Sequence, residues 1–287
     1  MNGVSIIVPA FNEEESIENT LRRLCELGQS IEHWQIVVVD DGSTDNTSHI
    51  CSSFEKITRI RHPRNLGYGA ALKTGIKNAT YDAVGIIDAD GTYPIEKLAE
   101  LWNIFQNDDT DMVVGARVGR DAKIPMVRRP AKWVINAIAN YLVKEKIPDL
   151  NSGLRIMRKT AVVKFLNILP DGFSFTTTIT LAFFLNGHPV EYVVIPYNNR
   201  TGKSKIRPIR DTLNFLQLLI RTTLYFDPLR IYGPLAIFLF LCGCAVLIGS
   251  YLVTGTPMDV TFGVIVMTSV ITLALGMLAD LIDKRLK

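Results

Sequence analysis

Apolar and polar positions divide the chain into two regions. In the first region, short apolar runs of strand length alternate with stretches of helical periodicity. Strands are expected at Val4–Val8, Ile36–Val39, Ile57–Ile60, Val84–Ile87 and Met112–Val114. Helices are expected at Glu13–Leu27, from about Asp45, at Tyr68–Asn78 and at Pro94–Phe105. Because the strand segments are almost continuously apolar, the alternation predicts an α/β fold with a mainly parallel sheet that is covered on both faces.

Two long uncharged segments dominate the second region. Ile231–Val253 and Val260–Ala279 contain no Asp, Glu, Lys, Arg or His. Each is long enough for a helix that crosses a bilayer core of about 30 Å. A turn-rich hexapeptide, Thr254–Asp259, separates them. A pair of buried core helices is the alternative, but the length of the segments favours a transmembrane hairpin.

Basic residues flank this hairpin on one side only. The hexapeptide carries a single charge, Asp259, whereas the basic residues lie before the first span and after the second: Lys203, Lys205, Arg207, Arg210, Arg221, Arg230, Lys284, Arg285 and Lys287. The positive-inside rule therefore predicts that both termini are cytoplasmic. We expect no signal peptide, because no basic n-region and apolar h-region precede a cleavage site.

The segment between the two regions has two faces. Along Ile206–Phe226, polar residues at helical spacing form one stripe: Arg207, Arg210, Asn214, Gln217 and Arg221. Apolar residues form another: Ile209, Leu213, Leu216 and Ile220. This pattern predicts an amphipathic helix in the lipid headgroup layer, and a helix packed on the soluble domain is the alternative.

Composition excludes other classes of protein. With 21% charged and 48% hydrophobic residues in 287, the chain cannot be wholly disordered. A net charge of +3 is too small to indicate a nucleic-acid partner. The four cysteines lack metal-type spacing and are expected to be reduced thiols.

From the pattern of apolar and polar segments we expect four regions: a cytosolic domain at residues 1–205, an interfacial helix at 206–230, a hairpin at 231–280 and a cytosolic tail at 281–287.

Polar clusters follow the first two expected strands, where ligands bind in open α/β sheets. Pro9-Ala10-Phe11-Asn12-Glu13, taken alone, fits a strand end followed by a helix N-cap. In Asp40-Asp41-Gly42-Ser43, adjacent carboxylates repel each other unless a cation or hydrogen-bond donors hold them. Neighbouring strand residues face opposite ways, so only one of Asp40 and Asp41 can face a given ligand. An Asx turn is the alternative for this cluster.

Asp88-Ala89-Asp90 follows the fourth expected strand and is the strongest single signal. A spacing of two residues puts both carboxylates on the same side of an extended chain. Two convergent oxygens without a nearby His or Cys suit a hard cation such as Mg²⁺ or Mn²⁺, which would retain waters and bridge phosphates. A simple turn is the alternative.

Taken together, the three clusters resemble those of family 2 glycosyltransferases, which have the Rossmann-like GT-A fold. Further motifs make the chain similar to the polyprenyl-phosphate sugar synthases, such as dolichyl-phosphate mannose synthase and the bacterial undecaprenyl-phosphate glycosyltransferases. These motifs are Gly115-Ala116-Arg117, Asp149-Leu150-Asn151-Ser152-Gly153-Leu154-Arg155, Arg200-Thr201-Gly202-Lys203-Ser204-Lys205 and the terminal spans. Thr92 replaces a Gln that often binds metal in mannose synthases, and the Arg200–Lys203 loop differs from theirs. The donor sugar therefore stays open.

The resemblance implies an inverting, metal-dependent transfer of one monosaccharide from a UDP- or GDP-sugar to a membrane polyprenyl phosphate. Asp88 and Asp90 would hold Mg²⁺ or Mn²⁺, and Asp90 would be catalytic. The implied contacts to the nucleotide sugar are Pro9, Ala10, Glu13, Asp40, Asp41, Asp88, Ala89, Arg200 and Lys205. The implied location is the inner or plasma membrane of a bacterium or archaeon, with the lipid bilayer as a partner.

A lipid monophosphate acceptor is already ionised near neutral pH, so a general base is less necessary than for a sugar hydroxyl. Catalysis must bring two phosphorylated groups together and stabilise a departing nucleoside diphosphate. In the basic stretch from Arg117 to Lys132, Arg117, directly after an expected strand, and Arg128 are expected to bind the lipid phosphate, and Arg117 is also expected to be catalytic. A solvated loop or a lipid-headgroup contact is the alternative for this stretch. Ser152 and Ser204 are further expected contacts to the lipid phosphate. Asp149 is expected to be catalytic as an orienting group or auxiliary base.

Two other functions stay open. A processive family 2 polysaccharide synthase would need a pore that two spans do not obviously form, and Gln217–Thr222 lacks the Gln-x-x-Arg-Trp signature of such enzymes. A non-catalytic, nucleotide-binding membrane scaffold would not need the intact Asp88-x-Asp90 pair. Because lone spans often associate, a homo-oligomer is also open.

Overall fold

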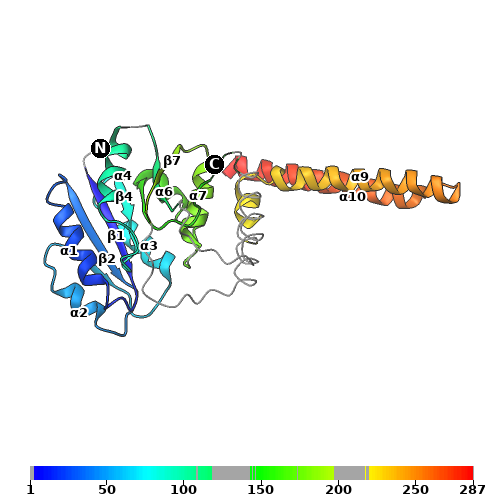
Figure 1. Cartoon of the computed structure of the whole chain (residues 1–287). Helices are drawn as coiled ribbons and strands as arrows, with labels where there is room; N and C mark the ends of the chain where they lie inside the picture. Colours follow the sequence, from blue (N-terminus) through cyan, green and yellow to red (C-terminus); the bar gives the residue numbers. More distant parts are fainter. Residues whose placement is uncertain are drawn as a thin grey trace. The chain divides into compact units, whose positions relative to one another are not determined.

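The computed structural model describes residues 3–107, 109–117, 143, 145, 147–172, 174–196, 217 and 220–286. The chain divides into two compact units, Met1–Thr212 and Leu213–Lys287. Figure 1 shows both units, and each is described by itself below.

The first unit is built on a sheet of seven strands in the order β3-β2-β1-β4-β6-β5-β7. The strands are β1 (Val4–Ala10), β2 (Trp34–Asp40), β3 (Thr58–Arg61), β4 (Ala83–Ile86), β5 (Met112–Ala116), β6 (Arg155–Arg158) and β7 (Val190–Val194). Strand β6 runs antiparallel to β4 and β5, and the other pairings are parallel. The prediction of a mainly parallel α/β sheet is confirmed.

Helices cover both faces of this sheet (Figure 1). They are α1 (Ile17–Leu27), α2 (Thr47–Ser52), α3 (Tyr68–Asn78), α4 (Lys97–Asn107), α6 (Lys159–Phe165) and α7 (Phe175–Leu185). Along β2, Val38 packs in the cluster that contains Leu21 of α1, whereas Val37 and Val39 pack with Ala71 of α3. Because successive strand residues face different helices, the strands must be apolar at nearly every position.

The second unit contains two long apolar helices, α9 (Leu229–Thr254) and α10 (Asp259–Leu286). They pack as an antiparallel hairpin: Ser269 donates to the carbonyl of Ala236 at 2.7 Å, and a Cβ on Gly276 would lie 2.5 Å from that of Tyr232. Both helices are long and apolar enough to cross a membrane. The predicted pair of apolar C-terminal helices is confirmed.

The predicted interfacial helix lies mostly outside the described residues. Residues 220–226 are helical, and residues 206–216 are not described. The amphipathic helix therefore stays a prediction.

Candidate functional site

The carboxyl ends of β1, β2 and β4 meet at one edge of the sheet. In the register of the parallel pairs, Ala10 lies opposite Asp40 and Ile7 lies opposite Ile86. The three polar clusters of the sequence therefore leave neighbouring strands at the same edge. This edge is where an open α/β sheet binds its ligands.

Hydrogen bonds join the loop after β1 to the loop after β2. The backbone N–H of Asn12 donates to Ser43 Oγ at 3.0 Å, and Asn12 Oδ1 accepts from the N–H of Thr44 at 2.9 Å. The N–H of Glu13 donates to Thr47 Oγ1 at 2.8 Å. Asn12 has a φ of 54°, a conformation that asparagine adopts more readily than most residues. The two loops therefore form one unit, a contact that the local sequence pattern did not indicate. The N-cap of α1 is Ser16, beyond the segment Pro9–Glu13 for which a strand end and a helix N-cap were expected.

The residues at the end of β1 that were expected to contact the nucleotide sugar differ in their exposure to solvent. Pro9 and Ala10 are buried within β1, which continues to Ala10, and Glu13 is half-buried. Phe11 between them is 40% exposed. Ala89, also expected to contact the donor, is buried after β4.

Both carboxylate oxygens of Asp41 are hydrogen-bonded to the protein. Its Oδ1 accepts from the backbone N–H of Leu66 at 2.9 Å and lies 2.7 Å from His62 Nδ1, while Oδ2 accepts from the N–H of Gly67 at 2.8 Å. The residue is 3% exposed. The loop between β3 and α3 thus supplies the donors that an adjacent carboxylate pair requires, and Asp41 organises that loop.

Asp40 has a different environment although it is also buried. Its Oδ1 accepts from the backbone N–H of Ser43 at 2.8 Å. Among the described residues, Oδ2 receives no hydrogen bond, and Arg61 Nε approaches it only to 3.4 Å. The guanidinium side chain of Arg61 is 58% exposed, so it covers Asp40 from the solvent side.

Asp88 and Asp90 lie in the loop after β4, which ends at Ile86. The chain turns at residues 89–90, so the argument that a spacing of two places both carboxylates on the same side of an extended chain does not apply here. Tyr68 Oη donates to Asp88 Oδ1 at 2.8 Å. Asp90 Oδ1 accepts from the N–H of Thr92 at 3.1 Å and from its hydroxyl at 2.6 Å. Thr92 thus fixes Asp90 in a turn. Mannose synthases often have a metal-binding Gln at the position of Thr92.

Burial, followed by the charge of Asp88, raises the pKa of Tyr68 well above its usual value. The same two causes, in the same order, raise the pKa of Tyr93. Both phenols therefore stay protonated near neutral pH, and Tyr68 remains a donor to Asp88.

The donor set of this loop fits a hard divalent cation. Asp88 and Asp90 offer carboxylate oxygens, the ligands that Mg²⁺ prefers and that also suit Mn²⁺. Gly153 lies so close that a Cβ there would be 2.6–2.8 Å from the carboxylate atoms of Asp88. Within the described ranges no three His, Cys, Asp or Glu side chains converge. A cation at Asp88 and Asp90 would therefore complete its shell with water or phosphate, as Mg²⁺ usually does.

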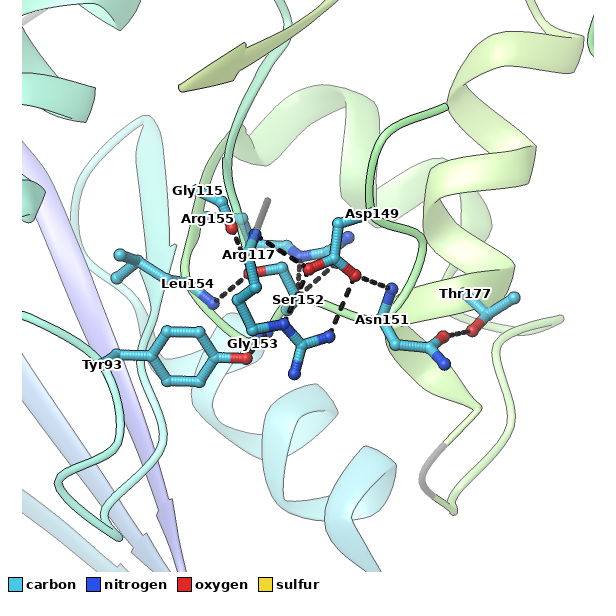
Figure 2. A network of polar contacts seen from close by, with 10 residues as sticks. All are labelled: Tyr93, Gly115, Arg117, Asp149, Asn151, Ser152, Gly153, Leu154, Arg155 and Thr177. Atoms are coloured by element: carbon cyan, nitrogen blue, oxygen red, sulfur yellow. Dashed lines mark hydrogen bonds and ion pairs between the residues drawn. The ribbon is translucent and has the colours of Figure 1, made fainter. Parts of the chain in front are cut away.

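Arg117 and Asp149 form a bidentate ion pair beside this loop (Figure 2). Arg117 Nε donates to Asp149 Oδ2 at 2.7 Å, Nη2 donates to Oδ1 at 2.9 Å, and the Arg117 backbone N–H donates to Oδ2 at 3.1 Å. Arg117 also lies over the ring of Tyr93, 5.9 Å from its centroid. The guanidinium is thus fixed in one orientation while 26% of the side chain remains exposed.

Burial would raise the pKa of Asp149, but the hydrogen bond and the charge of Arg117 outweigh it and lower the pKa below its usual value. A carboxylate with a lowered pKa is a weak base at neutral pH. The environment of Asp149 therefore favours the orienting role over the role of auxiliary base.

Ser152 was expected to bind a lipid phosphate, but its side chain faces the protein interior. Its side chain is fully buried, and its hydroxyl donates to the carbonyl of Gly115 at 2.5 Å. A direct contact with a phosphate would require this bond to break. The remaining expected phosphate and donor contacts, Arg128, Arg200, Ser204 and Lys205, lie outside the described residues.

The sequence model of the Glycosyl transferase family 2 matches residues 5–166, which span all three strand-end clusters and the Asp149–Arg155 loop. The chain belongs to this family. It is a glycosyltransferase, and the predicted GT-A fold is confirmed.

Several relatives of this glycosyltransferase are named as enzymes that transfer a sugar to a polyprenyl phosphate. The dodecaprenyl-phosphate galacturonate synthase of Rhizobium johnstonii is 25% identical over 300 residues, covering 98% of this chain and 88% of the relative. The UDP-N-acetylglucosamine–dolichyl-phosphate N-acetylglucosaminyltransferase of Methanococcus voltae is 30% identical over 181 residues, 55% of this chain and 70% of the relative. The predicted resemblance to the polyprenyl-phosphate sugar synthases is confirmed.

Solved structures of glucosyl-3-phosphoglycerate synthase from Mycobacterium tuberculosis share the fold. The complex with phosphoglyceric acid has a TM-score of 0.61 at 18% identity and covers 77% of this chain and 80% of that one. The complex with Mn²⁺, UDP and glucosyl-3-phosphoglycerate has a TM-score of 0.60 at 17% identity, with the same coverage.

Substitution of Gly153 tests the packing around Asp88 in this glycosyltransferase. Gly153→Ala is expected to push the Asp88 carboxylate out of place and to reduce turnover about tenfold or more, because misplaced catalytic groups are costly. Steady-state turnover and the affinity for Mn²⁺ would be measured together. A variant with wild-type values for both would contradict the close packing of Gly153 on Asp88.

Acid should remove the stabilisation that Asp149 provides. The pKa of Asp149 is lowered in the folded protein, so its contribution is present above the unfolded value of about 4 and is lost as the pH falls through the folded value. The difference in melting temperature between wild type and Asp149→Asn should therefore be constant from neutral pH to about pH 5 and shrink below about pH 4. A difference that grows on acidification would contradict the ion pair.

Proposed function

We propose that this glycosyltransferase transfers one sugar from a nucleotide sugar to a membrane polyprenyl phosphate, with inversion and with Mg²⁺ or Mn²⁺. The observation that carries the proposal is the similarity to the dodecaprenyl-phosphate galacturonate synthase over 98% of this chain. That coverage includes the two apolar helices α9 and α10, which a soluble acceptor would not require. Relatives named for dolichyl phosphate acceptors support the same lipid class.

The proposed topology places the catalytic domain, residues 1–205, and both termini on the cytoplasmic side. The basic flanks of the two spans and the single acidic residue between them support this orientation. Residues 206–230 would lie at the membrane surface, and residues 231–280 would form the hairpin. The acceptor phosphate would then be reached at the headgroup layer.

On the donor side, the carboxyl ends of β1 and β2 and the loops after β1 and β4 would bind the nucleotide sugar. The proposed contacts are Pro9, Ala10, Glu13, Asp40, Asp88 and Ala89. Asp40 suits a direct contact better than Asp41 does, because both carboxylate oxygens of Asp41 are already hydrogen-bonded to the β3–α3 loop. Asp40 Oδ2 receives no hydrogen bond from a described residue, and displacement of Arg61 would open it. Arg200 and Lys205 are proposed to close over the phosphates.

Asp88 and Asp90 would hold the divalent cation, which supplies positive charge to the diphosphate of the donor and of the leaving nucleoside diphosphate. Tyr68 fixes one oxygen of Asp88, and Thr92 fixes one oxygen of Asp90. The two carboxylates are thereby held in place before the donor binds, which lowers the cost of ordering them during the reaction.

On the acceptor side, Arg117 would bind the phosphate of the lipid, with Arg128 and Ser204 as further contacts. Asp149 presents the guanidinium in one orientation through its bidentate pair. An ionised phosphate oxygen then attacks the anomeric carbon from the face opposite the leaving diphosphate, which inverts the configuration. No residue needs to remove a proton from the acceptor, which agrees with the lowered pKa of Asp149.

A donor panel tests this proposal. The detergent-purified chain, polyprenyl phosphate, Mg²⁺ or Mn²⁺, and a series of UDP- and GDP-sugars would be followed by release of nucleoside diphosphate. We expect release with one donor, dependent on both the lipid phosphate and the cation. Release that is independent of the lipid phosphate would contradict the acceptor, and release that EDTA does not affect would contradict the metal.

A further inference from the structure

Arg155 is a buried cation that the proposed chemistry does not use. It is the first residue of β6, and its side chain is fully buried. Nε and Nη2 both donate to the carbonyl of Ser152, at 3.1 and 2.5 Å, beside the Arg117–Asp149 pair (Figure 2). Nη1 donates to the carbonyl of Thr176 at 3.1 Å and to Thr180 Oγ1 at 3.0 Å. In the described part of the chain, Arg155 thus hydrogen-bonds only to uncharged groups.

A buried guanidinium that no carboxylate of the described residues hydrogen-bonds is an expensive way to fill space. Burial lowers the pKa of Arg155, which shows the cost of desolvating its charge. A methionine would occupy a similar volume without that cost. What the guanidinium adds is geometry, because its planar fork fixes two backbone carbonyls in relation to each other. These carbonyls belong to the loop of residues 149–154 and to helix α7.

A second contact joins the same loop to α7. Thr177 Oγ1 donates to Asn151 Oδ1 (Figure 2), and the backbone N–H of Asn151 donates to Asp149 Oδ1 at 3.0 Å. Thr177 is 1% exposed, so its hydroxyl has few other partners. The first turns of α7 therefore hold the loop that orients Asp149 and, through it, Arg117.

The segment that leads into α7 contacts the donor side of the site. The carbonyl of Asp171 accepts from the backbone N–H of Ala70 at 3.1 Å, and its carboxylate lies 2.7 Å from Lys73 Nζ. Both partners belong to α3, whose first residue, Tyr68, donates to Asp88. Gly69 allows this close approach, because a Cβ there would overlap the backbone of residues 170–172.

We propose that Arg155 is a positioning residue that ties the loop of residues 149–154 to α7 and thereby sets the distance between the Arg117–Asp149 pair and Asp88. The inference rests on the proposed function, because it takes Arg117 as the acceptor side and Asp88 as the donor side. Transfer requires two phosphorylated groups to meet in one geometry. A displacement of about 1 Å can reduce the rate about 10²-fold.

Two variants and a matched control test the proposal in the full-length enzyme. Arg155→Lys keeps the charge but cannot bridge both carbonyls. Thr177→Val removes one hydroxyl at nearly constant volume. Thr178→Val is the control, because Thr178 is equally buried on α7 but donates to Ser174 within its own helix, at 2.9 Å.

We expect kcat per folded molecule to fall about 10²-fold in Arg155→Lys and about tenfold in Thr177→Val. The KM for the nucleotide sugar should stay within about twofold of wild type, and Thr178→Val should behave as wild type. A purely structural role would lower the melting temperature and the folded fraction but leave kcat per folded molecule unchanged. That result would overturn the proposal.

Hydrogen exchange separates this proposal from the proposed function. Without any substrate, the backbone amides of residues 149–154 and 66–72 should exchange faster in Thr177→Val than in Thr178→Val. Equal exchange in both segments would overturn the link through α7. A wild-type enzyme that transfers no sugar to the lipid, yet shows the expected exchange difference, would overturn the proposed function alone.

Discussion

Replacing Asp90 by alanine is expected to reduce sugar transfer on the order of 10³-fold while the chain still folds and inserts. The variant loses one of the two carboxylates proposed to hold the cation, which supplies several kcal/mol of charge stabilisation, and each ~1.4 kcal/mol is tenfold in rate. It also loses the acceptor for the N–H and hydroxyl of Thr92, at a cost of about 1 kcal/mol each. Turnover and the melting temperature would be measured on the same preparation.

Two comparisons make the Asp90 result specific. Asp90→Asn keeps an acceptor for Thr92 but removes the charge, so it should lose transfer to a similar extent with a smaller effect on stability. Asp82→Ala changes an exposed carboxylate next to the opposite end of β4 and should be fully active. Activity of Asp90→Ala within about tenfold of wild type would contradict the metal assignment.

An Arg117→Lys variant is expected to lose about 10²–10³-fold in kcat/KM for polyprenyl phosphate, the range found when one stabilising donor is removed from an active site. Lysine keeps the charge but cannot make the bidentate pair with Asp149. The KM for the nucleotide sugar should hardly change, because the loops after β1, β2 and β4 are proposed to bind it. Initial rates over both substrate concentrations would separate the two effects.

Arg158→Lys is the matched control for Arg117→Lys. Arg158 pairs with Asp111 at the other end of the sheet, with similar exposure, 32% against 26% for Arg117. Arg158→Lys should keep wild-type kinetics.

Asp149→Asn should lose less activity than Arg117→Lys and keep the wild-type pH profile if Asp149 only orients Arg117. Loss of an acidic limb from that profile would instead identify Asp149 as a base.

The elements with clear periodicity could be predicted from the sequence. Helix α3 has the predicted bounds, Tyr68–Asn78, and the central strands lie where continuous apolar runs indicated. Strand β6 was missed because Arg155 and Arg158 flank only two apolar residues, and its pairing depends on contacts with β4 and β5, far away in the chain. Helix α7 was missed because it is buried on nearly every side and rich in threonine, a poor helix former.

In the candidate site, too, some features could be predicted from the sequence and others could not. The spacing of Asp88 and Asp90 after an apolar strand indicated a hard cation, and the resemblance to family 2 glycosyltransferases added the diphosphate of a nucleotide sugar. Which of Asp40 and Asp41 is hydrogen-bonded through both oxygens could not be predicted, because the backbone donors to Asp41 come from the distant loop between β3 and α3. The pair of Arg117 with Asp149 joins residues that are 32 positions apart, and no local pattern predicts such a contact.

The mass of the lipid product tests the central claim most directly. Polyprenyl phosphate would be incubated with the full-length enzyme, its nucleotide sugar and Mg²⁺ or Mn²⁺, and the extracted lipid would be analysed by mass spectrometry. We expect a mass increase of a single sugar residue on the polyprenyl phosphate and none with Asp90→Ala. An unchanged lipid with a growing saccharide chain would contradict it and identify a processive synthase.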